Sequence, residues 1–111
     1  MFKRRKQGAV NVVSGNVPLT GQHTQDLGVA LAECLLDGQP KAVLELQNVP
    51  LIDSAGLELL LDMQEQFERR AGVLKLASPN ALCSDILVAT GVGHRFEVYR
   101  EAKAAIGSFV Q

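Results

Sequence analysis

Short aliphatic runs alternate along the chain with longer stretches in which apolar residues recur every three or four positions. The short runs are typical of strands, and the spacing of three or four is typical of amphipathic helices. Strands are predicted at 9–13, 16–20, 41–46, 73–77 and 96–99. Helices are predicted at 24–37, 54–71, 80–90 and 100–110. The order β-β-α-β-α-β-α-β-α predicts an α/β domain with a mixed sheet and mostly parallel crossovers.

The helix predicted at 54–71 carries most of its apolar side chains on one broad stripe, which should face the core. The stripe comprises Leu57, Leu60, Leu61, Met63, Phe67 and Ala71. Leu59 falls well off the stripe, so it is expected on the outer side of the helix, in the company of Glu58 and Asp62.

The length and composition favour one ordinary globular domain. The chain has 111 residues, of which 47% are hydrophobic and 21% charged, with a formal net charge of −1. Such a charge gives no general attraction to nucleic acid, and no apolar run approaches the ~20 residues that membrane insertion needs. The basic stretch Lys3–Lys6 predicts a flexible, solvated tail over residues 1–8, with the folded domain at 9–111.

Cysteines and histidines give no pattern that holds a metal or cofactor. Cys34 and Cys83 lie far apart in aliphatic surroundings, which predicts buried free thiols in a reducing, cytoplasmic compartment rather than a disulfide. His23 and His94 fall in loops, so Ser54, the best candidate nucleophile, lacks an evident base. No metal, no cofactor and no catalytic residue are therefore predicted.

The stretch "LIDSAGLELLL" at 51–61 interrupts two apolar segments with Asp53-Ser54-Ala55-Gly56. It lies beyond the C-terminal end of a predicted parallel strand and at the start of a helix, which is where α/β proteins tend to bind ligands and partners. A purely structural explanation is also open: Asp53 or Ser54 caps the helix, and Gly56 allows a close approach of two backbones.

Several motifs in this order resemble the STAS domain family, which includes the anti-sigma factor antagonists. The resemblance covers about residues 10–108. It is carried by Glu45 on a strand, Asp53-Ser54-Ala55-Gly56-Leu57, Gly72-Val73-Leu74-Lys75-Leu76, Ser78-Pro79, Thr90-Gly91 and Phe96-Glu97-Val98-Tyr99. It implies a STAS-like single domain, with a mixed sheet of four or five strands and about four helices packed mainly on one side.

The resemblance implies a non-catalytic protein that binds a regulatory partner, an anti-sigma factor that is also a serine kinase. In the phospho-regulated members the kinase modifies the Ser or Thr immediately before the glycine. Here that position is Ala55, and Ser54, one residue earlier, is the remaining candidate acceptor. The acidic residue that many members carry after the first strand is also missing from Gly15-Asn16-Val17-Pro18.

A second branch of the family offers an alternative. The sequence Asp-Ser-Ala-Gly-Leu followed by leucines also resembles the small STAS subunits that dock on the ATPase of phospholipid-transport ABC systems. Under either implication the partner is a protein, and the expected contact surface lies at 53–62. It comprises Asp53, Ser54, Ala55, Gly56, Glu58, Leu59 and Asp62, with Ala55 and Leu59 as an apolar centre inside a polar rim.

Overall fold

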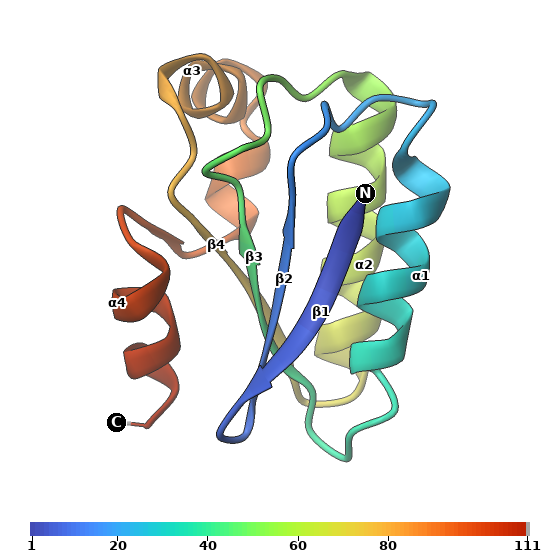
Figure 1. Cartoon of the computed structure of the whole chain (residues 1–111), viewed down its shortest axis with the longest axis vertical. Coiled ribbons are helices and arrows are strands. Elements are labelled where there is room, and N and C mark those ends of the chain that lie inside the picture. Colours follow the sequence, from blue (N-terminus) through green and yellow to red (C-terminus); the bar gives the residue numbers. More distant parts are fainter. Residues whose placement is uncertain (111) are drawn as a thin grey trace.

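A five-stranded mixed sheet forms the centre of the molecule (Figure 1). The structure is a computed structural model, and it describes residues 1–110. The strands are β1 (Phe2–Gln7), β2 (Val10–Gly15), β3 (Lys41–Glu45), β4 (Val73–Ala77) and β5 (Val98–Tyr99). Their spatial order is their chain order; β1 runs antiparallel to β2, and the strands from β2 to β5 are parallel to one another.

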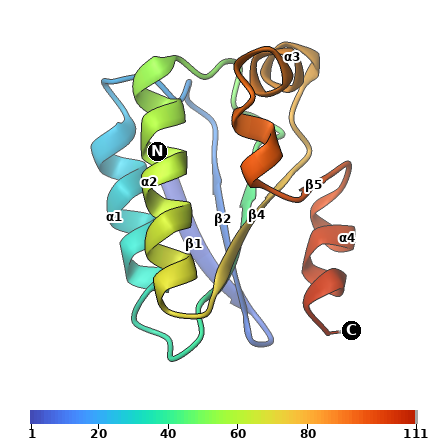
Figure 2. The same ribbon diagram turned by 180° about the vertical axis from the view of Figure 1, so that it is seen from behind.

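Four α-helices cover the sheet, three of them on one face (Figures 1 and 2). They are α1 (Thr24–Cys34), α2 (Ser54–Arg69), α3 (Ala81–Thr90) and α4 (Ala102–Gly107), with 3₁₀ turns η1 (Val92–Arg95) and η2 (Ser108–Val110). The larger core, between the sheet and α1, α2 and α3, includes Leu31, Leu44, Leu60, Phe67 and Leu76. A smaller core beneath α4 joins Val43 and Ala77 to Ala105. The predicted five-stranded arrangement with helices mainly on one side is confirmed.

The expected flexible tail at residues 1–8 is wrong, because Phe2–Gln7 forms the edge strand β1. Phe2 is buried, and its ring occupies the space where a side chain at Gly15 would stand. Lys6 Nζ lies 2.8 Å from a carboxylate oxygen of Asp37. An edge strand with one face in solvent needs few apolar residues, so a basic sequence can still form it.

The strand expected at 16–20 is absent from the described residues, which show there a single parallel bridge between Leu19 and Ile52. The place beside β2 that such a strand would take is occupied by β1. Pro18 moreover has no N–H to donate to a ladder. From β2 onward the predicted order of elements is correct, but the second N-terminal strand is β1, before β2, and not the one expected at 16–20.

The remaining elements agree with the sequence apart from their ends. The helix expected over 24–37 stops at Cys34, and β5 keeps only the last two residues of 96–99. The helix expected over 100–110 begins at Ala102 and tightens into η2. Cys34 and Cys83 are buried free thiols, as predicted, and desolvation raises the pKa of Cys34 to about 11.

Two buried polar side chains join the layers. The side-chain amide of Gln64 on α2 donates to the carbonyls of Leu74 (2.9 Å) and Arg95 (3.0 Å), and its oxygen accepts the N–H of Leu74 (2.9 Å). On the other face, Lys75 Nζ donates to Ser108 Oγ at 2.7 Å. These bonds fix α2 against β4, and the C-terminal turn against the sheet.

Candidate functional site

The carboxylate of Asp53 joins two loops at the start of α2. Oδ1 accepts the N–H of Gly56 at 2.9 Å, which caps the helix, and Oδ2 accepts the N–H of Gly21 at 3.2 Å from the loop before α1. The backbone N–H of Asp53 donates to Leu19 C=O at 3.1 Å. Of the two caps left open by the sequence, Asp53 is therefore the correct one. Ser54 is the exposed first residue of the helix.

Gly56 is required by a close approach of backbones. A Cβ at this position would stand 2.4 Å from the carbonyl oxygen of Leu19 and 2.8 Å from the Cγ of the same residue. Real Cβ atoms do not approach so closely. The predicted packing role of Gly56 is confirmed, and it sets the first turn of α2 directly on the Leu19–Ile52 bridge.

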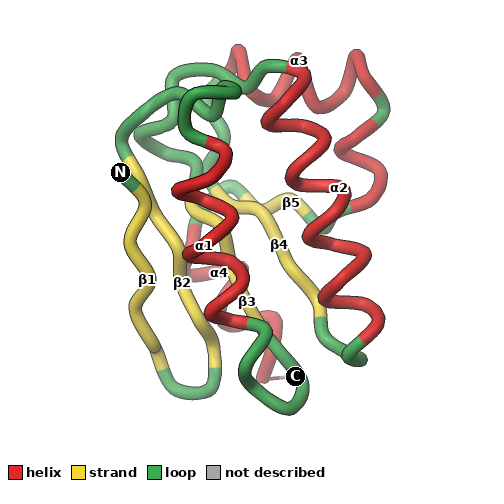
Figure 3. The backbone as a smooth tube through the Cα atoms, turned by 90° about the vertical axis from the view of Figure 1, so that its right-hand side faces the viewer, coloured by secondary structure: helices red, strands yellow, loops and turns green. Residues whose placement is uncertain are grey.

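Helices α1 and α2 lie side by side (Figure 3). An open groove of about 700 Å³ runs between them. Residues from both helices line it: Thr24, Gln25, Gly28, Val29, Ala32, Ala55, Glu58, Leu59 and Asp62. The groove brings together four of the seven predicted contact residues. Asp53 and Gly56 do not line the groove but hold the first turn of α2 in place through the bonds and packing just described. Ser54 does not line the groove either.

Leu59 is not the outward-facing residue that helical projection suggested. It is half-buried and packs against the core, with its Cδ1 3.6 Å from where a Cβ of Gly28 would stand. The reason is tertiary: α1 covers the flank of α2 on which Leu59 lies. Leu59 and Ala55 thus form an apolar floor of the groove, and not the exposed apolar centre that was expected.

The α1 side of the groove was missed by the sequence analysis. Val29 is 59% exposed, although it is apolar, and Gly28 stands in the interior of a helix, where glycine is unfavourable by ~1 kcal/mol relative to alanine. A glycine in the interior of a predicted helix, followed by a valine, is the signal in the sequence that could have indicated a surface on α1.

The charge of the groove is negative. Glu58 and Asp62 stand on its α2 side, and none of the described residues that line it is basic. Gln66 Nε2 donates to Asp62 Oδ2 at 3.3 Å, which holds that carboxylate on the helix surface. The arrangement, an apolar floor with an acidic rim, suits a partner that offers an apolar side chain next to a basic one.

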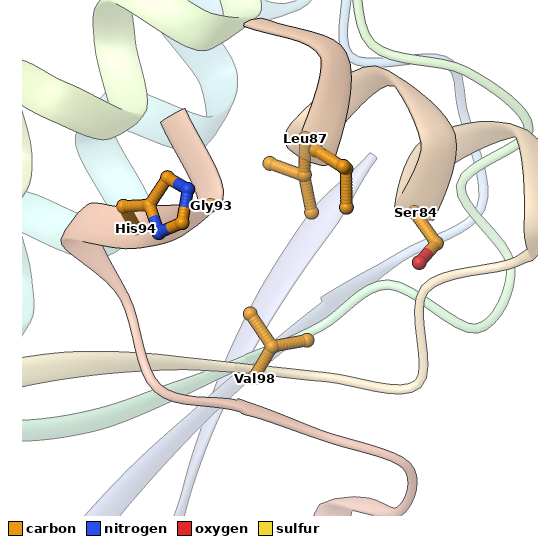
Figure 4. Close-up of a pocket in the computed structure, with 6 residues that line it drawn as sticks. Ser84, Leu87, Gly93, His94 and Val98 are labelled. Carbon is orange, nitrogen blue, oxygen red and sulfur yellow. The ribbon is translucent and has the colours of Figure 1, made fainter. Parts of the chain in front are cut away.

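A second concavity, of about 220 Å³, lies between α3, η1 and β5 (Figure 4). Its lining is mainly apolar and comprises Ser84, Leu87, Val88, Gly93, His94 and Val98.

His23 precedes α1 without capping it through its side chain. Over residues 1–110, acidic, histidine and cysteine side chains form no group of three suited to a metal ion.

Solved structures with the same fold include anti-sigma factor antagonists. A protein of Thermotoga maritima assigned to that class superimposes with a TM-score of 0.91 at 22% identity, over 99% of this chain and 95% of that one. For an antagonist from Mycobacterium paratuberculosis the TM-score is 0.89 at 20% identity, over 100% and 94%. For the phosphorylated form of the Bacillus cell fate determinant SpoIIAA the values are 0.73 and 16%, over 98% and 99%.

These structural similarities establish the fold. No curated protein sequence matches the chain. No helix of the described chain has the length and apolar character to cross a membrane. The STAS domain model matches residues 2–105, from β1 into α4. The chain therefore belongs to the STAS domain family.

Proposed function

We propose that this protein is a non-catalytic, cytoplasmic interaction module of the anti-sigma factor antagonist type. Its partner is an anti-sigma factor with serine-kinase activity, which docks on the first two turns of α2 and on the groove between α1 and α2. Structural neighbours that are antagonists support the general kind of function. Two buried free thiols suit a reducing compartment.

The observation that carries the proposal is the composition of the groove. Ala55 and Leu59 form its apolar floor, and Glu58 and Asp62 form an acidic rim. Interfaces commonly combine an apolar centre with a polar periphery, and complementary charge speeds the encounter of the partners. Glu58 is exposed, so it can be changed without disturbing the fold.

Phosphorylation is not part of the proposed cycle at the usual position, because Ala55 has no hydroxyl. Its Cβ faces the loop before α1, 3.8 Å from where a Cβ of Gly21 would stand. A phosphate on a serine at this position would add about −1.5 to −2 charges to a groove that is already acidic. We expect Ala55→Ser to be phosphorylated by the partner kinase and the parent protein to stay unmodified, as intact-mass measurement after incubation with ATP would show.

Ala55 also supports a second candidate function. A site whose usual acceptor position has no hydroxyl suits a constitutive subunit better than a phosphorylation switch. We therefore keep the alternative that the same groove docks the chain on the ATPase of a phospholipid-transport ABC system. The two functions use one surface and differ in the partner.

The test begins with capture of the partner from the native cells on the tagged full chain and its identification by mass spectrometry. A serine-kinase anti-sigma factor supports the first function, and an ABC ATPase supports the second. The affinity of the purified partner is then measured by calorimetry for Glu58→Lys and for Asp85→Lys. Asp85 is exposed on α3, outside the groove, and the substitution there makes the same change of charge.

Glu58→Lys reverses a charge on the rim of the groove, so it should weaken partner binding by more than ~1 kcal/mol. Asp85→Lys should bind the partner as the parent protein does. Equal affinity of the two variants would show that the partner docks elsewhere. If the protein chemically converted the captured partner, the non-catalytic function would be refuted.

A further inference from the structure

Strand β5 leaves one side of its backbone open. It is the last strand of the sheet, paired only with β4. Leu76 N–H donates to the carbonyl of Glu97 (3.0 Å), and Ser78 N–H donates to the carbonyl of Tyr99 (2.8 Å). Because peptide groups of successive residues point to opposite sides of a strand, the N–H and C=O of Val98 point away from β4. They form a donor and acceptor pair at the free edge.

The side chain of Val98 marks an apolar hollow beside that edge. Glu97 and Tyr99 lie on the α4 face of the sheet, so Val98 faces α3. There it borders the 220 Å³ pocket, with Leu87 pointing toward it in Figure 4. Val98 is 44% exposed and Val88, on the rim, is 74% exposed. Two exposed valines at one mouth, next to an open edge, are more than scattered surface residues.

A cation stands further along the same side. A neighbouring hollow of about 330 Å³ shares Ser84 and Val98 with the 220 Å³ pocket and extends to Arg100. Arg100 is exposed, and no salt bridge to it occurs within residues 1–110. An open backbone edge, an apolar hollow and a cation two residues further on therefore follow one another along β5.

We propose that an extended segment of a partner protein adds a strand to β5 through the N–H and C=O of Val98. The segment places an apolar side chain in the pocket between α3 and β5, and a carboxylate two residues away beside Arg100. This surface lies apart from the groove between α1 and α2, so it goes beyond the proposed function and can be tested independently of it.

Strand geometry gives this spacing. A segment residue that exchanges hydrogen bonds with Val98 has its side chain on the same face of the sheet as that of Val98, above the pocket. Side chains two residues apart share a face, so the neighbour at this distance reaches the level of Arg100. Main-chain bonds supply affinity and the pocket supplies selectivity in this mode of recognition. β5 offers few main-chain bonds, so the complex should be transient.

The test starts from a displayed library of random octapeptides, selected on the full-length protein and counter-selected on Val88→Asp. We expect enriched peptides to carry an acidic residue two positions from a large apolar one. A synthetic peptide of the enriched sequence should shift the amide resonances of Leu87, Gly93 and Val98 in a ¹⁵N spectrum. Its affinity should fall at least about tenfold on Val88→Asp, and Leu36→Asp, at an exposed leucine outside the pocket, should leave it unchanged.

Val98→Pro tests the backbone directly. Proline removes the outward N–H and leaves the bonds to β4 in place, a substitution that edge strands tolerate. Peptide affinity should fall at least about fivefold, and Val98→Ile, which keeps the N–H, should retain binding. Should Val98→Pro fail to fold, N-methylation of the peptide residue that pairs with Val98 makes the same test on the unchanged protein.

Three results would overturn the proposal. The library could yield no peptide above the background of Val88→Asp, or the peptide could shift resonances in the groove between α1 and α2 instead. Concentration-dependent shifts at Val98 without peptide, together with a dimer in sedimentation, would show that a second copy of the chain occupies the edge.

Discussion

Replacing Gly56 by alanine sets two physical effects against each other. Alanine is the better helix former, and in an exposed helix interior the change would stabilise the protein by ~1 kcal/mol. In this structure the added Cβ would overlap the carbonyl oxygen of Leu19, at 2.4 Å. That oxygen accepts the N–H of Asp53, so it cannot turn aside without breaking a hydrogen bond.

The overlap should decide the sign. Overpacking of a filled core typically costs about 1–3 kcal/mol, and a contact with a tethered backbone atom belongs at the upper end of that range. Set against the gain in helix propensity, Gly56→Ala should lower the free energy of unfolding by about 2 kcal/mol. Urea unfolding followed by circular dichroism measures this difference.

Gly28→Ala is the matched control, because it makes the same substitution inside α1. Its added Cβ would meet Leu59 Cδ1 at 3.6 Å, an ordinary contact. The control should therefore gain about 0.5–1 kcal/mol of stability. If Gly56→Ala were as stable as the parent or more so, the close packing of α2 on Leu19 would be refuted.

Three further predictions concern other parts of the molecule. Gln64→Leu should destabilise the protein by about 3 kcal/mol, since the N–H and C=O of Leu74 would be left buried without partners; urea unfolding measures it, and a change below about 1 kcal/mol would contradict this role of the amide. Leu59→Lys should destabilise by about 1 kcal/mol, because the side chain is half-buried; an unchanged unfolding midpoint would instead favour the outward position that helical projection gave. The hydrogen bond from Lys6, with a second amide donor, lowers the pKa of Asp37. The contribution of the Asp37 carboxylate to folding stability is therefore present above the unfolded carboxyl pKa of about 3.9. It is lost as the pH falls through the lower pKa of the folded state. Asp37→Asn should flatten the loss of stability as the pH falls below about 4, and an identical pH profile would exclude a role for this carboxylate.

The sequence predicts well those elements whose apolar residues follow one period. The helix at 54–71 and the strand at 73–77 are nearly correct because their buried residues, Leu60, Phe67, Leu74 and Leu76 among them, carry the signal. β1 was missed because Phe2 is its one buried residue. Its remaining residues are polar or charged, and they are indistinguishable from a solvated tail until β2 is there to pair with them.

The sequence predicted only the α2 side of the candidate site. Ala55, Glu58, Leu59 and Asp62 lie on one helix, so their spacing brings them together. The other wall of the groove comes from α1, and a single sequence gives no information on which helix packs beside which. Gln64 was missed for a related reason: it falls within the apolar stripe, but its polar amide gave no signal of a partner, and only the tertiary structure shows the backbone groups it satisfies.

The bridge made by Asp53 has a consequence for the kinetics of association. One carboxylate fixes the loop before α1 and the first turn of α2 in a single rigid unit. A partner that lands on the groove then meets both walls in their final positions, so little conformational entropy is lost on binding. Free and bound forms should differ mainly in side-chain rotamers. Affinity can in this way exceed what so small a surface would give if the two loops had to be ordered during the encounter.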